Sequence, residues 1–357
     1  MDRFLAIQKH IHKDIAFIIN KYDYYLKGKC ENTLLGHHKD ITCLDILHSA
    51  KGERIVSGSA DKLLKIWNPL TFECEGTLIG HEKGISCLMI LSDNRIVSGS
   101  NDKLLKIWNP LTSRCELTLV GHTKGITCLA LLSDDRIVSG SKDKSIKIWN
   151  SGQCEFTLLG HIDIINNLYI LPSLDNKRIV STSCYGLLKM WNSSECEFTI
   201  SEDEASISCL LILPDRRIVT GSYDHSIKIR NPLTFKCEGT LVGHERGISC
   251  LALLPLLEGF RIVSGSYDKS IKIWNPISGE CELTLRSYNA WIKDIHVLPD
   301  NRIVSILYDK SFKIWNSLSE KCEFILHGHT AHVSCVNILG DRRIVSGSED
   351  GSLKIWN

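Results

Sequence analysis

Short segments that alternate apolar and polar residues recur along most of the chain. The clearest covers Arg136–Asn150 and reads RIVSGSKDKSIKIWN. In it, a β-branched run, a polar turn at Lys142–Lys144 and a second alternating run follow one another. Alternation with a period of two is typical of β-strands, and an Asp in the turn can accept hydrogen bonds from nearby backbone N–H groups. The segment therefore predicts a β-hairpin.

The hairpin pattern occurs eight times, and close copies lie at Arg54–Asn68, Arg95–Asn109 and Arg343–Asn357. One copy ends in Arg230-Asn231, and the other seven end in a Trp-Asn pair; the tryptophans are Trp67, Trp108, Trp149, Trp191, Trp274, Trp315 and Trp356. Successive copies are 39 to 44 residues apart. This period indicates a repeat architecture in which each unit buries its apolar face on its neighbours.

Each repeat contains four predicted strands separated by short turns. In the first repeat they are Cys30–Leu35, Ile41–Leu47, Arg54–Ser59 and Leu63–Trp67, and Cys74 starts the next cycle. The last repeat ends at Trp356-Asn357 without a fourth strand of its own. If the array closes into a ring, Cys30–Leu35 completes the last repeat, and the two exposed edges of an open array disappear.

The first 26 residues follow a different pattern. Apolar residues recur at spacings of three and four from Phe4 to Tyr22, which predicts an amphipathic α-helix with Asp2 as its cap. This helix either packs on the main body or docks a partner or a preceding domain. The start of the chain carries charges where a signal peptide needs an apolar core, so we expect no secretion.

A Gly-His pair precedes the hairpin in six repeats; the pairs are Gly36-His37, Gly80-His81, Gly121-His122, Gly160-His161, Gly243-His244 and Gly328-His329. With Ser-Gly-Ser-x-Asp and Ile-Trp-Asn after these pairs, residues 30–357 resemble the WD40-repeat β-propellers, with Asn in place of the final Asp. The resemblance implies an all-β, eight-bladed WD40 β-propeller over residues 27–357, closed by the N-terminal strand and preceded by a short α-helix over residues 1–26. A weaker similarity, in the near-identity of the repeats and in Lys21–Tyr25, is to WD-repeat proteins of giant DNA viruses, some of which carry a BTB domain.

The WD40 resemblance implies a hydrogen-bonded tetrad of His, Ser, Asp and Trp in five repeats. The members are His37, Ser57, Asp61 and Trp67; His81, Ser98, Asp102 and Trp108; His122, Ser139, Asp143 and Trp149; His244, Ser264, Asp268 and Trp274; and His329, Ser346, Asp350 and Trp356. A His–Asp–Ser set also looks like a hydrolase triad, but a catalytic triad occurs once and faces a pocket. Five copies therefore favour a structural role.

Three repeats depart from this pattern. Tyr185 replaces the Asp of repeat four, Asp203 and Arg230 replace the His and Trp of repeat five, and Tyr288 replaces the His of repeat seven. Either the remaining blades hold the ring and the departures are tolerated, or repeats four to seven have been released from the structural pattern to serve a partner.

The resemblance also implies a binding face around the mouth of the central channel, built from two sets of variable positions. The first set is Ala60, Asn101, Lys142, Cys184, Tyr223, Tyr267, Tyr308 and Glu349, and the second includes Asp40, Gly84, Gly125, Ser206, Ser208, Gly247, Trp291, Lys293 and His332. Aromatic residues gather in repeats five to seven, and exposed Tyr and Trp dominate binding hot spots. We therefore predict a partner-binding patch of Tyr223, Tyr267, Trp291 and Tyr308, with Lys293 as its polar contact; the alternative is that the tyrosines only cap turns.

Composition limits the classes of function. The 357 residues include 42 Lys and Arg against 41 Asp and Glu, which gives no electrostatic footprint for nucleic acid or an anionic membrane. No apolar run reaches the length of a membrane span. Fourteen of the fifteen cysteines follow the repeat: eight open the Cys-type strand (Cys30, Cys74, Cys115, Cys154, Cys196, Cys237, Cys281 and Cys322) and six lie 13 residues further on (Cys43, Cys87, Cys128, Cys209, Cys250 and Cys335). We interpret them as reduced, buried thiols, which indicates a reducing compartment, the cytoplasm or the nucleus.

A Lys lies two residues before each repeat-ending Trp or Arg, and a Glu follows each strand-opening Cys. Lys65 and Glu75 are ten residues apart, and Lys147 and Glu155 are eight apart. A change of two preserves the face of a strand, so we predict a cross-strand Lys–Glu pair in each blade, with Lys354 paired to Glu31 across the closure.

These features favour a non-catalytic scaffold that binds peptide or protein partners, as a monomeric propeller within a larger complex. The alternative is the substrate-recognition subunit of a ubiquitin ligase, with the N-terminal helix as the adaptor contact. The sequence has no Gly-rich phosphate loop, no nucleophile elbow and no CxxC, so we expect no enzyme activity, no metal and no cofactor.

Overall fold

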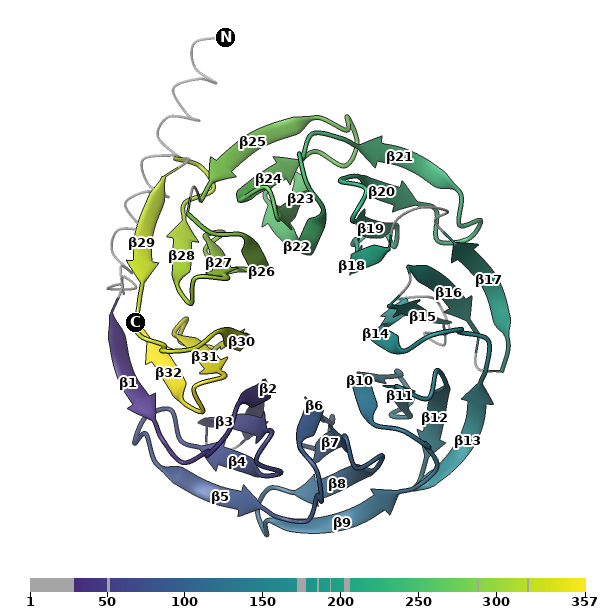
Figure 1. Cartoon of the computed structure of the whole chain (residues 1–357), viewed down its shortest axis with the longest axis vertical. Coiled ribbons are helices and arrows are strands. Elements are labelled where there is room, and N and C mark those ends of the chain that lie inside the picture. The colour runs from purple at the N-terminus through teal and green to yellow at the C-terminus, as the bar shows by residue number, and fades with distance from the viewer. Residues whose placement is uncertain are drawn as a thin grey trace, which may run out of the picture.

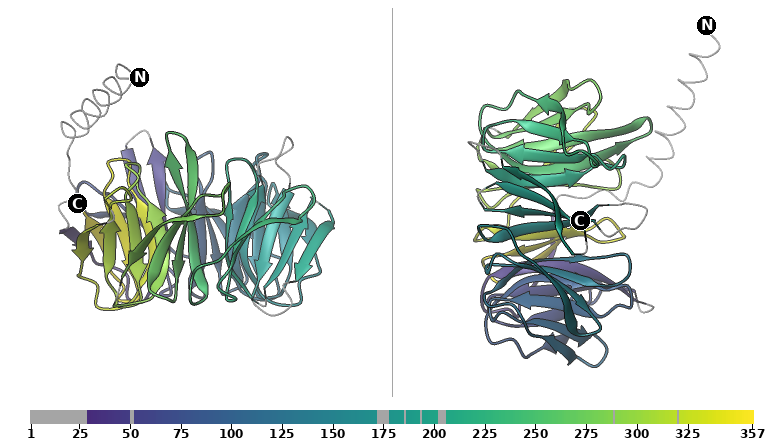
Figure 2. Two further views of the ribbon diagram at one scale, coloured as in Figure 1. Left: turned by 90° about the horizontal axis from the view of Figure 1, so that it is seen from above. Right: turned by 90° about the vertical axis from the view of Figure 1, so that its right-hand side faces the viewer.

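The structure is a computed structural model that describes residues 29–49, 52–171, 178–184, 186–192, 194–201, 206–287, 289–319 and 321–357. In these residues, 32 strands form eight four-stranded antiparallel sheets. The sheets are arranged as the blades of a flat ring around a central axis (Figures 1 and 2). The described residues thus form an all-β, eight-bladed propeller, and the predicted helix over residues 1–26 lies outside them.

In each blade the four strands lie side by side, in order from the channel to the rim. The blades are numbered along the chain, and blade one begins with β2. Blades one to four contain β2 (Ile41–Ser49), β3 (Gly52–Ser59), β4 (Leu64–Trp67) and β5 (Cys74–Leu78); β6 (Ile85–Ile90), β7 (Ile96–Ser100), β8 (Leu105–Asn109) and β9 (Arg114–Leu119); β10 (Ile126–Leu131), β11 (Ile137–Ser141), β12 (Ile146–Asn150) and β13 (Gln153–Leu158); and β14 (Ile165–Leu171), β15 (Arg178–Ser183), β16 (Leu187–Trp191) and β17 (Cys196–Ser201). Blades five to seven contain β18 (Ile207–Ile212), β19 (Ile218–Ser222), β20 (Ile227–Arg230) and β21 (Cys237–Leu241); β22 (Ile248–Leu256), β23 (Gly259–Ser266), β24 (Ser270–Trp274) and β25 (Cys281–Arg286); and β26 (Ile292–Val297), β27 (Ile303–Leu307), β28 (Phe312–Trp315) and β29 (Cys322–Leu326).

Blade eight joins the two ends of the described chain. It contains β30 (Val333–Ile338), β31 (Ile344–Ser348) and β32 (Leu353–Trp356), and β1 (Cys30–Leu34) is its outermost strand. Thr33 pairs with Lys354 and Leu34 with Leu353. In Figure 1 the purple β1 accordingly lies beside the yellow β32. Every sheet in the described ring therefore has four strands.

The apolar core lies between blades rather than inside one sheet. Ile and Val of the second strands are fully buried, as at Ile55 and Val56. A Cβ placed on Gly58 would lie 2.7 Å from Ile85 Cγ2 of the next blade and 2.7 Å from Cys43 Sγ. This close approach explains the Gly in the Ser-Gly-Ser motif of blade one, since a larger residue there would come too close to Ile85 and Cys43.

The predicted Lys–Glu pairs are wrong. Trp67 pairs with Cys74, whereas Ile66 pairs with Gly76, so Glu75 is the extra residue of a β-bulge. The bulge shifts the register by one residue, and Lys65 instead lies opposite Thr77, to which its Nζ donates a 3.1 Å hydrogen bond.

The same correction applies at the ring closure, where Lys354 Nζ donates to Thr33 Oγ1 at 2.7 Å. In seven blades the Glu side chain of the Cys-type strand pairs instead with the Arg that comes directly before the Ile-Val pair of the second strand. Arg261 Nε, for example, donates to Glu282 Oε2 at 2.6 Å.

The cysteines divide into two environments, so the prediction of buried thiols is only half right. Six thiols lie on the innermost strands between blades, and burial raises the pKa of Cys43 and Cys128 to about 12. The cysteines that open the outermost strands are instead exposed in seven of eight blades, as at Cys30 and Cys74. The outermost strand has no neighbour on its rim side, and nothing in the repeat spacing encodes that difference.

Candidate functional site

Each complete His–Ser–Asp–Trp set forms one hydrogen-bonded chain inside a blade. In blade one, His37 Nδ1 lies 2.8 Å from Asp61 Oδ2, and His37 Nε2 lies 2.8 Å from Ser57 Oγ. The Trp67 indole N–H donates to the same Ser57 Oγ at 2.8 Å. Because the carboxylate only accepts, Nδ1 carries the imidazole proton, and the Ser57 hydroxyl donates to Nε2 while it accepts from Trp67.

The other four sets repeat this geometry with distances of 2.7–2.9 Å; they are centred on Ser98, Ser139, Ser264 and Ser346. In three of the five blades a further hydroxyl joins the set. Ser145 Oγ donates to Asp143 Oδ1 at 2.6 Å and lies 3.2 Å from His122 Nδ1. Ser270 and Ser352 occupy the same position. The sequence analysis missed this fifth member, although the Asp-x-Ser spacing was visible.

Burial and hydrogen bonding together set the charge states of these groups. It lowers the pKa of His37, so the imidazole is neutral at neutral pH. Burial alone would raise the pKa of Asp61, but the hydrogen bonds from the His38 N–H and from His37 outweigh it and lower that pKa. Ser57 is fully buried, and its oxygen already accepts from Trp67, so no substrate can reach it as a nucleophile. The geometry supports a structural role for the set.

The departing repeats keep parts of the arrangement. In blade four, His161 Nε2 lies 2.6 Å from Ser181 Oγ, which also accepts from the Trp191 indole N–H at 2.7 Å. Burial lowers the pKa of His161 to about 4. In blade five, Arg230 is buried in the place of the tryptophan. Tyr185, Asp203 and Tyr288 lie outside the described residues.

One backbone hydrogen bond recurs in all eight blades and brings the two sets of variable positions together. In blade one the Ala60 N–H donates to the Asp40 carbonyl at 2.9 Å. The equivalent donor–acceptor pairs are Asn101–Gly84, Lys142–Gly125, Cys184–Ile164, Tyr223–Ser206, Tyr267–Gly247, Tyr308–Trp291 and Glu349–His332. These loops lie at one end of the ring, and we call this end the upper face.

Four aromatic side chains of the upper face contact one another in series across blades five to seven. The rings of Tyr223 and Tyr267 stack with centroids 6.0 Å apart and planes 11° from parallel. Trp291 meets Tyr267 edge-on at 6.0 Å and Tyr308 edge-on at 6.0 Å. We call Tyr223, Tyr267, Trp291 and Tyr308 the aromatic arc.

Three members of the aromatic arc are exposed, Tyr267 between them is partly buried, and the arc is supported from below. Tyr223 is 50% exposed, Trp291 44% and Tyr308 36%. A Cβ on Gly247 would lie 2.9 Å from Tyr223 Cδ1, so the glycine leaves room for the Tyr223 ring to lie close over the neighbouring loop. Desolvation and the neighbouring phenols of Tyr223 and Tyr308 raise the pKa of Tyr267, so all of its contacts are made as the neutral phenol.

Lys293 does not have the position that the sequence predicted for it. Its Nζ donates to the Val333 carbonyl of the next blade at 2.5 Å, and the side chain is half-buried. The same strand position holds Thr42 and Ser86, whose hydroxyls donate to the next-blade carbonyls of Ile85 and Ile126. Lys293 therefore replaces a hydroxyl that links adjacent blades, and that bond uses one of the three N–H donors of its ammonium.

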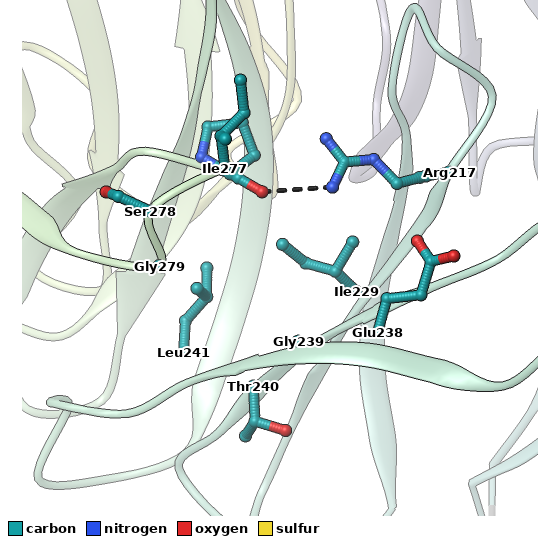
Figure 3. A pocket seen from close by; sticks show the side chains of 10 residues that line it. Arg217, Ile229, Glu238, Gly239, Thr240, Leu241, Ile277, Ser278 and Gly279 are labelled. Atoms are coloured by element: carbon teal, nitrogen blue, oxygen red, sulfur yellow. Dashed lines mark hydrogen bonds between the residues drawn. The ribbon is translucent and has the colours of Figure 1, made fainter.

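A hollow of about 510 Å³ lies at the rim between blades five and six (Figure 3). Figure 3 shows Arg217 reaching across it, and Arg217 Nη1 donates to the Pro276 carbonyl at 3.1 Å. The lining comes from β21 and from the turn after β24, at the opposite end from the upper face. The hollow thus lies between two neighbouring blades, and the hydrogen bond from the Arg217 guanidinium links them.

Within the described ranges, no group of three or more His, Cys, Asp or Glu residues is placed to hold a metal ion. The part of the chain that the structure describes also contains no helix long and apolar enough to cross a bilayer.

A family model described as WD40 (WD domain, G-beta repeat) matches residues 28–68, 72–109, 113–150, 194–231, 235–275 and 320–357, more than half of the chain. The unmatched stretches contain the three inner strands of blades four and seven, which belong to two of the three departing repeats. No curated protein matches the chain.

Two solved structures show the same architecture. The computationally designed Ika8 protein is 28% identical, with a TM-score of 0.79 over 92% of this chain and 99% of that one. The WD40 beta propeller domain of Doa1 is 19% identical, with a TM-score of 0.61 over 92% of this chain and 96% of that one, and at this identity the likeness shows the fold alone. None of these comparisons supports the resemblance to giant-virus proteins with BTB domains.

Proposed function

The chain belongs to the WD40 family, and on that premise we propose that it is a scaffold that binds peptide or protein partners through the aromatic arc on its upper face. WD40 propellers are typically protein-interaction scaffolds and are generally non-catalytic. The fold therefore supplies the class of function, and the aromatic arc supplies the site.

The observation that carries the proposal is the exposure of Trp291. The seven repeat-ending tryptophans are each 0–4% exposed, whereas Trp291 is 44% exposed beside three tyrosines. The seven repeat-ending indoles are buried in the core, whereas the aromatic arc forms a continuous, solvent-exposed surface across three blades. Large, rigid aromatic side chains supply contact area at low entropic cost, which is why they dominate binding hot spots.

Two observations favour a binding role for the aromatic arc over the capping of turns by its tyrosines. The backbone bond that closes each loop is made equally well by Ala60 in blade one and by Tyr267 in blade six, so the ring is not needed for the turn. The tyrosine rings also contact rings of neighbouring blades rather than their own turn.

A surface that spans three blades needs blades in fixed positions. We include in the proposal that residues 27–357 act as one unit and that pairing of β1 with β32 keeps the ring closed. The ubiquitin-ligase alternative rests on residues 1–26, which lie outside the described residues, and it stays a prediction from the sequence.

The test is selection from a random peptide library displayed on phage, with the purified chain as bait. Selected peptides are then titrated against the wild type and the Tyr267→Ala/Trp291→Ala variant. The matched control is Leu70→Ala/Leu111→Ala, which removes exposed apolar side chains from turns at the opposite end. We expect at least a tenfold loss of affinity in the first variant and about none in the control; equal affinity in all three proteins would rule out the aromatic arc as the site.

A further inference from the structure

The charged side chains of the upper face are unevenly distributed. The loops of blades one to three carry seven exposed lysines, which we call the basic arc: Lys39, Lys62, Lys83, Lys103, Lys124, Lys142 and Lys144. The exposed carboxylates in the same loops are Asp40 and Glu82. The tetrad carboxylates of Asp61, Asp102 and Asp143 are 5–7% exposed and are occupied by their histidines.

The other half of the face has no such excess. In the described loops of blades five to eight, the exposed acidic residues are Asp224, Glu245, Asp309 and Glu349, and the basic residues are Arg246, Lys269 and Lys310. The excess of positive charge on this face is therefore confined to the three blades with small or polar residues at the channel mouth.

The lysines of the basic arc are available to a ligand. Among the described residues, no carboxylate lies within ion-pair distance of their ammonium groups, and Lys142 Nζ donates to the neutral Asn101 Oδ1 at 2.9 Å. Like charges that repel one another without an internal partner gain most from an anionic ligand. The basic arc is thus an unpaired feature of the fold.

The two arcs face each other across the channel mouth. In Figure 1 the innermost strands β2, β6 and β10 of the basic arc lie opposite β18, β22 and β26 of the aromatic arc. An extended chain crossing the mouth would contact both, with alternate side chains directed toward the surface.

Resting on the proposed function, we infer that the partner is an acidic peptide segment. An apolar or aromatic side chain of this segment lies on the aromatic arc, and its Asp or Glu carboxylates lie over the basic arc. Aromatic contact provides affinity, and the lysines provide orientation and a faster association rate.

A protein ligand fits this layout better than a nucleic acid. Single-stranded nucleic acids need aromatic and basic side chains along one path, because each nucleotide carries both a base and a phosphate. Here the two kinds of side chain occupy separate arcs, and the whole chain has a formal net charge of only +1.

The peptide selection described above also tests this inference through the composition of the selected peptides. We expect enrichment of Asp and Glu together with an apolar anchor. The Lys39→Glu/Lys83→Glu/Lys124→Glu variant should bind the selected peptides at least tenfold more weakly, and wild-type affinity should fall as salt is raised. The control Arg114→Glu/Lys236→Glu/Lys321→Glu makes the same change in charge at the opposite end and should bind within about twofold of the wild type.

The outcomes separate the two claims. Selected peptides that lack acidic residues, or that bind the Lys39/Lys83/Lys124 variant normally, overturn the inference; if they still need Tyr267 and Trp291, the proposed function stands. Tighter binding of a polythymidine oligonucleotide than of any selected peptide overturns the inference in favour of nucleic acid. A selection that enriches no peptide contradicts both.

Discussion

Arg343 and Glu31 are 312 positions apart in the chain, yet Arg343 Nη1 donates to Glu31 Oε2 at 3.0 Å. The same nitrogen donates to the Pro69 carbonyl of blade one at 2.9 Å, and Arg343 is buried. In blade six the equivalent bond joins Arg261 to Glu282 within a continuous stretch of chain. The same Arg–Glu contact thus links strands within blade six and links the two ends of the described chain in blade eight.

Arg343→Ala should therefore cost more than Arg261→Ala. Loss of Arg343 leaves the Glu31 carboxylate and the Pro69 carbonyl without that donor at the closure, and we expect a loss of about 2–3 kcal/mol of unfolding free energy. Arg261→Ala removes a more exposed pair and should cost about 1 kcal/mol or less. Urea titration measures both, and equal losses would show that the closure has no special dependence on Arg343.

Ser139→Ala should destabilise the ring strongly. The Ser139 hydroxyl accepts from Trp149 and donates to His122, so its removal leaves two buried polar groups unsatisfied. We expect a loss of about 2–4 kcal/mol by thermal or urea unfolding. The exposed Ser92→Ala is the control and should cost less than about 1 kcal/mol; a similar small loss at Ser139 would argue against the tetrad as a source of stability.

Stability should fall when the pH drops from about 6.5 to 4. Burial lowers the pKa of His161 to about 4, whereas an imidazole in the unfolded chain titrates near 6.5. Between these values the unfolded chain binds more protons than the folded chain, so the stabilising contribution is complete above about pH 6.5 and is lost as the pH falls.

The variant His161→Leu isolates this effect, because leucine does not titrate. Its unfolding free energy should decline less steeply over this range than that of the wild type, by about 1–3 kcal/mol in total. The exposed Leu159 does not titrate, so Leu159→Ala serves as the control and should keep the wild-type slope. Identical slopes in all three proteins would mean that His161 titrates normally in the fold.

Trp291 should dominate the accessible tryptophan fluorescence of the free protein. The seven repeat-ending indoles are buried, so a neutral quencher such as acrylamide should reach Trp291 first. Trp291→Phe should remove most of the readily quenched emission, whereas the variant Trp108→Phe should leave it in place. Unchanged quenching in Trp291→Phe would place the Trp291 indole under a neighbouring surface.

The sequence predicted the repeat features well because they depend on residue type at a fixed spacing. Eight copies of one hairpin imply eight blades, and the alternation of Arg136–Asn150 defines which side chains turn inward. The exposure of Trp291 also followed from its position, because it lies outside the buried Trp-Asn series.

The wrong predictions share a physical cause: each depended on a detail that spacing does not encode. Glu75 sits in a bulge, so counting residues placed it opposite the wrong partner. The spacing predicted Lys293 as the polar contact of the patch but did not indicate that its length lets it take the place of a blade-linking hydroxyl, as at Ser86, and reach the Val333 carbonyl. Exposure of Cys30 and Cys74 depends on the rim of the assembled ring, which no single repeat contains.

The most direct test of the central claim is the emission of Trp291 during titration with a library-selected peptide. If the peptide lies on the aromatic arc, wild-type tryptophan emission shifts as the peptide saturates the protein, and the shift disappears in Trp291→Phe while calorimetry still detects binding. The same shift in Trp291→Phe, or saturable binding with no shift in the wild type, would place the partner elsewhere on the propeller and contradict the account.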